Sequence, residues 1–192
     1  MDLSRREALH RLTLLVGGAL SAPTLGALLS GCRVEPSAPD WVPRVLTPDE
    51  LELLELLVER IIPTTDTPGA RDAGVPAFID ALLDTWVDVA GRERFLSGLA
   101  AVDQGSAATD GVAFRRATPE RQDALLARLD EEAARAREED VDPLPFFATL
   151  KEWTLVGYYT SEVGATQELQ WLAAPGRYDG DLPLEEVGPT WA

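Results

Sequence analysis

Residues 146–159, FFATLKEWTLVGYY, repeat large apolar side chains at helical spacing. Pro143 and Pro145 precede this run and favour a helix that starts just after them. The rings recur on one side of the expected helix, which predicts that this side is buried against other helices. We therefore expect residues 146–159 to form the central helix of the fold. The large side chains of the pattern are those of Phe146, Phe147, Leu150, Trp153 and Tyr158.

Four further helices are expected on either side of this run. Thr47, Pro48 and Glu50 form a capping-box pattern, which predicts a helix from there to Pro63. The other helices are expected from Pro76, over residues 92–102, and from a second Thr-Pro-Glu sequence at residues 118–120.

The connecting segments predict the rest of the layout. Residues 105–111 are small and Gly-bounded, so we expect a linker there, while Trp86 is expected to face inward and Lys151 to lie on a solvated face. Frequent Gly and Pro after Gly164 exclude a long helix. No run alternates as a strand does, so the expected fold is all-α, an irregular bundle of about five helices with a loop-rich aromatic C-terminal tail.

The composition limits the chemistry of the chain. Its 192 residues carry a formal net charge of −16, with 17 Lys plus Arg against 33 Asp plus Glu, which argues against nucleic acid as a partner. His10 and Cys32 are the only residues of their types, and the sequence has no Gly-rich nucleotide motif and no Cys-x-x-Cys. We therefore expect no catalytic, cofactor-binding or metal-binding residues in this chain.

The amino terminus has the pattern of an export signal. Arg5 and Arg6 precede the mildly apolar residues 12–29, an order that favours the twin-arginine route. The run ends in Leu28-Leu29-Ser30-Gly31-Cys32, which resembles a bacterial lipobox. We expect residues 1–31 to be a signal peptide and Cys32 to be lipidated, which would anchor the protein to a membrane in the periplasm or cell envelope. The alternative is a cleaved soluble signal that leaves an idle thiol.

The rest of the chain then divides into two parts. Residues 32–46 carry several prolines and no apolar period, so they are expected to form a tether, and residues 47–192 to form the helical domain.

Two long strings resemble a known family. Residues 155–169, LVGYYTSEVGATQEL, and residues 61–70, IIPTTDTPGA, are similar to the gluconate 2-dehydrogenase subunit 3 family, as are Gly74-Val75-Pro76 and residues 175–180. The resemblance covers most of the chain after Cys32. Many relatives have a Cys where this sequence has Asp181, so a thiol role at that position does not transfer.

What the resemblance implies is a non-catalytic small subunit. The expected partner is a large flavoprotein of the glucose-methanol-choline type that carries FAD, with a haem-containing cytochrome c subunit in some complexes. In that arrangement the small subunit stabilises the flavoprotein and supplies the export signal for both. Two other readings remain open: a free-standing periplasmic hydrolase that uses paired carboxylates, and an envelope scaffold lipoprotein without a redox partner.

Several residues are candidates for the partner interface, each with a structural alternative. Asp66 is either a contact residue or part of a self-bonded turn, and Glu162 is either a buried carboxylate suited to acid–base chemistry or a cap or ion-pair residue. Adjacent rings on a helix point to different sides, so one of Tyr158 and Tyr159 is expected in the core and the other at the interface. The remaining aromatic candidates are Trp171, Tyr178 and Trp191. They either insert into a partner or fold back against the helices of this chain.

Overall fold

The computed structural model describes residues 41–174, 176, 180–188 and 190–191. Five long helices account for most of this part of the chain: α3 (Pro48–Ile61), α4 (Val75–Thr85), α5 (Val89–Asp110), α6 (Pro119–Glu138) and α7 (Phe146–Tyr159). Three short elements complete it: the 3₁₀ helix η1 (Phe114–Arg116), the π-helix η2 (Gly164–Glu168) and α8 (Leu184–Val187). No β-strand occurs among the described residues, and the expected all-α bundle is confirmed.

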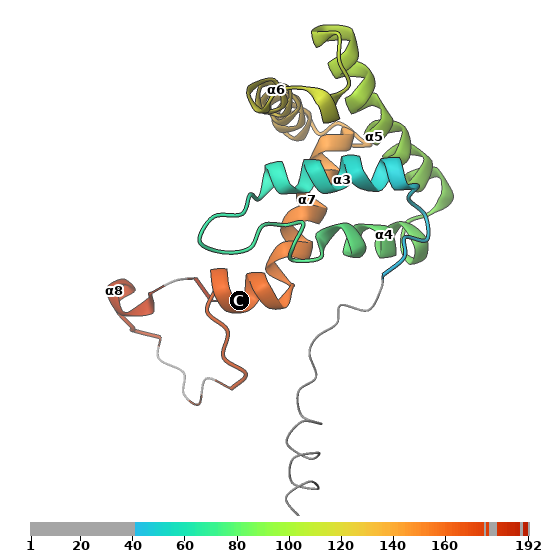
Figure 1. Cartoon of the computed structure of the whole chain (residues 1–192). Coiled ribbons are helices and arrows are strands. Elements are labelled where there is room, and N and C mark those ends of the chain that lie inside the picture. Colours follow the sequence, from blue (N-terminus) through green and yellow to red (C-terminus); the bar gives the residue numbers. More distant parts are fainter. Residues whose placement is uncertain (1–40, 175, 177–179, 189, 192) are drawn as a thin grey trace, which may run out of the picture. The chain divides into compact units, whose positions relative to one another are not determined.

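Helix α7 is the central helix, as its sequence pattern predicts. It contacts α3, α4, α5 and α6, and Figure 1 shows it crossing behind α3 and α4, which lie side by side. Its inner side carries the aromatic core. The ring of Phe95 from α5 stacks on Trp153 at 5.0 Å between centroids and meets Phe146 edge-on at the same distance. Such ring pairs add to the free energy gained by burying apolar area.

The other helices bury the apolar positions that their spacing indicates. Fully buried aliphatic side chains come from α3, α4, α5 and α7; the largest of them are Leu54, Leu57, Ile79, Leu83, Leu99 and Leu150. Phe114 of η1 is also fully buried and packs in the same cluster. Among the described residues, no helix has the length and apolar character needed to cross a bilayer.

The start of α3 confirms the predicted capping box. The hydroxyl oxygen of Thr47 accepts from the backbone N–H of Glu50 at 3.4 Å, and the Glu50 carboxylate accepts from the backbone N–H of Thr47 at 2.8 Å. These two bonds satisfy donors that a helix start otherwise leaves without partners. Asp88 caps α5 in a related way, by accepting from the N–H of Gly91 at 2.7 Å.

A buried carboxylate fixes the segment that leads into α3. Asp80 lies on α4, is 1% exposed, and accepts three backbone N–H groups. The donors are Arg44 at 2.8 Å and Val45 and Leu46 at 3.0 Å each. The chain is therefore attached to the helical domain from Arg44 onward.

Two expectations from the sequence are wrong. Residues 105–111 are not a linker, because α5 continues to Asp110 and ends at Gly111, which has φ 75°. Trp86 does not face inward but is 77% exposed, because α4 ends at Thr85 and the helical spacing does not extend to the next residue. Lys151, expected on a solvated face, is partly exposed, and its ammonium group pairs with the Asp130 carboxylate at 2.7 Å.

Candidate partner interface

The loop between α3 and α4 folds around one carboxylate of α3. One oxygen of Glu59 accepts from both the backbone N–H and the hydroxyl of Thr64, at 2.9 and 2.7 Å, and the other accepts from the N–H of Arg71 at 3.3 Å. The Thr64 hydroxyl in turn accepts from the N–H of Gly69 at 3.1 Å. A Cβ atom on Gly69 would displace the Glu59 carboxylate from the position in which it makes these bonds. The loop is thus held by specific bonds, as its Pro- and Thr-rich sequence predicts.

Asp66 lies at the outer part of this loop and is exposed. Its carboxylate accepts from the hydroxyl of Thr65 at 3.0 Å, and the Thr65 N–H donates to the Thr67 carbonyl at 3.0 Å. The turn interpretation is confirmed in this form. A contact between Asp66 and a partner stays a prediction that the exposed position allows.

Tyr158 joins the loop to the end of α7. Its side chain is buried, and its hydroxyl donates to the carbonyl of Pro68 at 3.0 Å. The hydroxyl of Thr67 lies 3.4 Å from the same phenol oxygen and donates to the Glu168 carboxylate in η2 at 3.0 Å. The loop, α7 and η2 are therefore tied together, and these are the segments that carry the two strings singled out in the sequence.

Tyr159, the neighbour of Tyr158, points to the outside. It is 39% exposed, and its ring meets that of Tyr158 edge-on. Tyr158 is therefore the ring in the core, and a place for Tyr159 at the partner interface stays a prediction. Leu155 and Val156 lie four and three residues before Tyr159 and are also exposed, so the three side chains form an apolar stripe along α7.

The π-helix η2 redirects the chain after α7. Gly164 is buried at its first position, and a Cβ atom there would collide with the backbone carbonyl of Tyr158. The Ser161 hydroxyl donates to that same carbonyl at 2.6 Å and accepts from the Gly164 N–H at 3.0 Å. Glu162 is exposed in this segment, so the hypothesis of a buried carboxylate is wrong: the residue lies where the chain turns away from the core.

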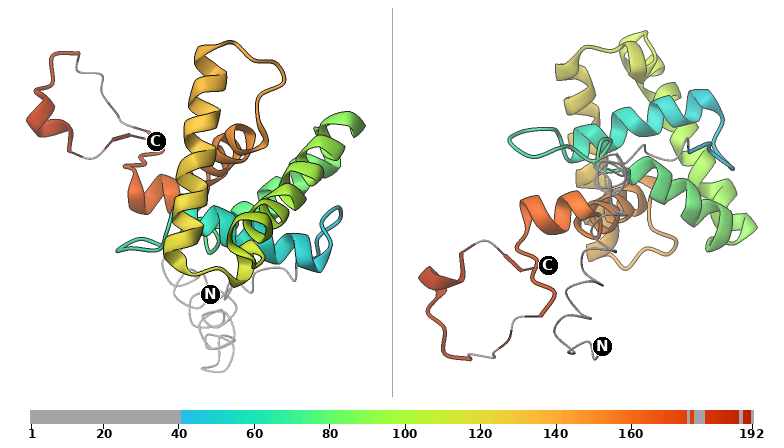
Figure 2. Two further views of the ribbon diagram at one scale, coloured as in Figure 1. Left: turned by 90° about the horizontal axis from the view of Figure 1, so that it is seen from above. Right: turned by 60° about the horizontal axis from the view of Figure 1, so that its bottom comes forward.

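The segment after η2, residues 169–191, is called the C-terminal arm below. Trp171 and Trp191 are 61% and 48% exposed, so neither ring is buried beneath the helices. They lie in a segment held mainly by its own backbone, and Figure 2 shows α8, within the arm, apart from the long helices. The described residues do not include Tyr178.

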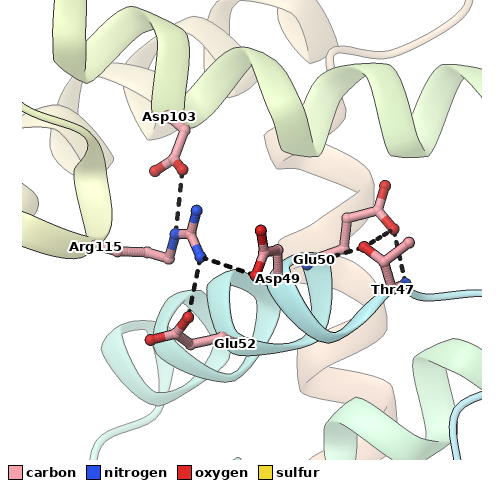
Figure 3. A network of polar contacts seen from close by, with 6 residues as sticks. All are labelled: Thr47, Asp49, Glu50, Glu52, Asp103 and Arg115. Carbon is pink, nitrogen blue, oxygen red and sulfur yellow. Dashed lines mark hydrogen bonds and ion pairs between the residues drawn. The ribbon is translucent and has the colours of Figure 1, made fainter.

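A charged network on another side of the domain joins α3, α5 and η1 (Figure 3). The Arg115 guanidinium contacts Glu52 at 3.0 Å, Asp103 at 3.2 Å and Asp49 at 3.8 Å. The hydrogen bond to Glu52, followed by the charge of Asp103, raises the pKa of Arg115. Because one guanidinium pairs with all three carboxylates, we interpret the network as a structural link between α3, α5 and η1 rather than as a free acid–base pair.

Several sequence-based predictions are not tested by this geometry. Arg5, Arg6 and Cys32 lie outside the described residues. Within the described part of the chain, no group of three or more His, Cys, Asp or Glu side chains is arranged to hold a metal ion.

The comparisons with known proteins give one match. No curated protein and no solved structure matches the chain significantly. The sequence profile of the family described as gluconate 2-dehydrogenase subunit 3 matches residues 48–176, from the start of α3 into the C-terminal arm. The match covers more than half of the chain and includes the loop around Glu59, α7 and η2, so this chain belongs to the gluconate 2-dehydrogenase subunit 3 family.

Proposed function

We propose that this protein is the non-catalytic small subunit of a flavin-dependent dehydrogenase for gluconate or another sugar or alcohol. The observation that carries the proposal is the family match over residues 48–176, because the family is described as one subunit of a dehydrogenase. The surface supports it. Large apolar side chains are exposed along α7 and in the C-terminal arm, as expected of a surface that another protein covers.

In this proposal the redox chemistry belongs to the partners. FAD is carried by a large flavoprotein of the glucose-methanol-choline type, and haem by a cytochrome c subunit where one is present. Without residues 1–31 the chain keeps no histidine, since His10 is the only one in the sequence, and that leaves no imidazole for acid–base catalysis or haem ligation. The role of the chain is then to bind the flavoprotein and stabilise its folded state by mass action.

Export and anchoring form the second half of the proposal. Arg5 and Arg6 belong to a twin-arginine signal, and that route carries the folded pair across the membrane on the signal of the small subunit. Cys32 receives the lipid that holds the complex at a membrane on the periplasmic side. Buried acyl methylenes contribute about 0.8 kcal/mol each, so an acidic protein is anchored without basic residues.

The test is to purify the tagged full-length chain from its native host and to record visible absorbance spectra. The expected result is an identified flavoprotein in a fixed ratio to the chain, with flavin bands and, if a cytochrome is present, haem bands. A chain recovered alone from the envelope would contradict the proposal and favour a scaffold lipoprotein. Turnover of a substrate by the isolated chain would favour the hydrolase.

Export and anchoring are tested separately. Replacement of both Arg5 and Arg6 by Lys should leave the chain and the flavoprotein in the cytoplasm, and Cys32→Ser should release an exported complex from the membrane. Unchanged export of the double Lys variant would contradict the twin-arginine route.

A further inference from the structure

The C-terminal arm exposes four large apolar side chains within one short segment. Trp171 is 61% exposed, Leu172 51%, Leu184 86% and Trp191 48%. None of the described residues between 169 and 191 is buried. Single exposed apolar residues are ordinary on protein surfaces, but this segment combines four of them and has no core among its described residues.

The arm nevertheless has a defined closure, here called the neck, made by Gln170, Val187, Thr190 and Trp191. The backbone N–H of Gln170 donates to the Thr190 carbonyl at 2.8 Å, and its side-chain amide donates to the Val187 carbonyl at 2.7 Å. Gln170 and Trp191 also form an isolated parallel bridge. The two ends of the arm are therefore held together through one glutamine.

Gly188 fits the neck for two reasons. Its φ of 69° is a conformation that residues with side chains rarely adopt. A Cβ atom on it would also lie 3.2 Å from the side-chain nitrogen of Gln170. The backbone next to Val187 is thus shaped to receive the Gln170 amide.

Closing a loop of this length reduces the conformational entropy of the chain, and burial of apolar surface is the main term that offsets such a loss. The described residues of the arm include none that is buried, so among them this offset is missing. An arm that is closed at the neck and exposes apolar side chains has instead the properties of a preorganised binding element. Its apolar surface becomes buried when a partner is bound.

The charge of the arm indicates what kind of partner fits. The sequence of the arm has one basic residue, Arg177, and four acidic residues, which are Asp179, Asp181, Glu185 and Glu186. The whole chain has a net charge of −16. A second copy of the chain or an anionic lipid surface would be repelled. A protein surface with apolar pockets and a rim of Lys and Arg is complementary.

We propose that the C-terminal arm is the element that docks this subunit on its large flavoprotein, with Trp171, Leu184 and Trp191 as the side chains that enter apolar pockets of the partner. This inference rests on the proposed function, which supplies the flavoprotein as occupant. The helical domain then serves as the platform that carries the arm, through α7 and η2.

The test compares variants of the full-length chain expressed in the native host. In the arm variant Trp171, Leu184 and Trp191 are replaced by Ser. Trp86→Ser is the control, because Trp86 is a tryptophan on the α4–α5 corner that is even more exposed, at 77%. The readouts are the amount of flavoprotein, identified by its flavin spectrum and by mass spectrometry, and its dissociation constant. The arm variant is expected to bind at least about tenfold more weakly, as for the loss of aromatic anchors at an interface, and the control to bind like the wild type.

A second pair of variants tests the neck without removing any apolar side chain. Gln170→Ala should weaken binding severalfold, because the open arm loses more entropy on docking, whereas Gln167→Ala, an exposed glutamine in η2, should have no effect. Unchanged helicity and melting temperature establish that the domain is folded in every variant. This is expected, since no described arm residue is part of the core.

The outcomes separate the two proposals. If the wild type brings down no flavoprotein, the proposed function fails and the arm loses its occupant. If the wild type binds the flavoprotein and the arm variant binds it equally well, the docking inference alone is overturned. It is also overturned if the arm variant abolishes a homodimer seen by light scattering, or abolishes binding of a Cys32→Ser chain to phosphatidylglycerol vesicles, while flavoprotein binding persists.

Discussion

Among the polar groups of the described core, the Asp80 carboxylate loses the most hydration free energy on burial. It is 1% exposed, and its only compensation for lost hydration is a set of three backbone donors from residues 44–46. Removing a charged acceptor from such a set leaves buried N–H groups without partners, which costs more than the bonds themselves contribute. Asp80 therefore links the start of the domain to α4 more strongly than the nearby surface ion pair between Arg44 and Asp84.

We predict that Asp80→Asn lowers the free energy of unfolding by about 2–3 kcal/mol. An asparagine keeps one acceptor oxygen but turns an amino group toward either the Arg44 N–H or the N–H groups of Val45 and Leu46. Urea unfolding followed by circular dichroism measures the change.

Asp84→Asn is the matched control for this prediction. It removes the 3.1 Å contact with Arg44, whose side chain is 72% exposed, and should change stability by less than about 0.5 kcal/mol. Equal effects of the two substitutions would show that the burial of Asp80 does not matter.

The role of Asp80 is not visible in the sequence, because its donors lie 34–36 residues earlier. The same applies to Tyr158. The Tyr158 ring is predicted to be large and apolar, but its bond to Pro68 joins residues 90 positions apart. Local patterns predict which side chains are buried; they do not predict which buried oxygen receives which distant donor.

At the scale of elements, the helix starts follow closely from local chemistry. The capping box at Thr47 and the ring pattern of α7 depend only on neighbours within a turn or two, and both are confirmed. The extent of α5 does not follow in this way. Its last part is small and polar, yet Val102 and Ser106 are buried and the Ser106 hydroxyl donates to the Val112 carbonyl at 2.9 Å. Tertiary packing and that bond keep the segment helical against its weak propensity.

Two glycines of α5 give a prediction that tests this extended helix. A Cβ atom on Gly105 meets nothing within 4 Å, so Gly105→Ala should raise the free energy of unfolding by about 0.5–1 kcal/mol. A Cβ atom on Gly98 collides with Phe146, so Gly98→Ala should lower it by about 1–3 kcal/mol.

Urea unfolding of both variants beside the wild type measures the difference. If residues 105–111 were a linker, Gly105→Ala would leave stability unchanged or reduce it. The opposite signs expected here depend on α5 being one helix from Val89 to Asp110.

At the scale of the whole molecule, the excess of acidic residues is the dominant feature. The chain of 192 residues has a net charge of −16, and the described ion pairs are mostly exposed, so they offset little of the mutual repulsion. The sequence alone predicts this charge and the absence of a basic stripe. It does not predict that exposed apolar side chains gather in the C-terminal arm, since that depends on the closure at Gln170 and on the bend at η2.

Salt should therefore act on the free chain and on its complex in opposite directions. Raising the ionic strength from about 0.01 M to about 0.15 M shortens the Debye length from about 30 Å to about 8 Å. In the free chain this screens repulsion among carboxylates. We predict that the free energy of unfolding rises by about 1 kcal/mol, seen as a rise of about 2–4 °C in Tm by calorimetry.

For capture of a partner with a basic rim, the same screening removes the attraction that speeds encounter, and the association rate in stopped flow should fall about tenfold or more. A Tm that falls with salt would mean that ion pairs outweigh repulsion in the free domain. An association rate that does not change with salt would mean that the partner surface is not basic, and the charge argument for a heterologous partner would then fail even if the apolar anchors of the arm are correct.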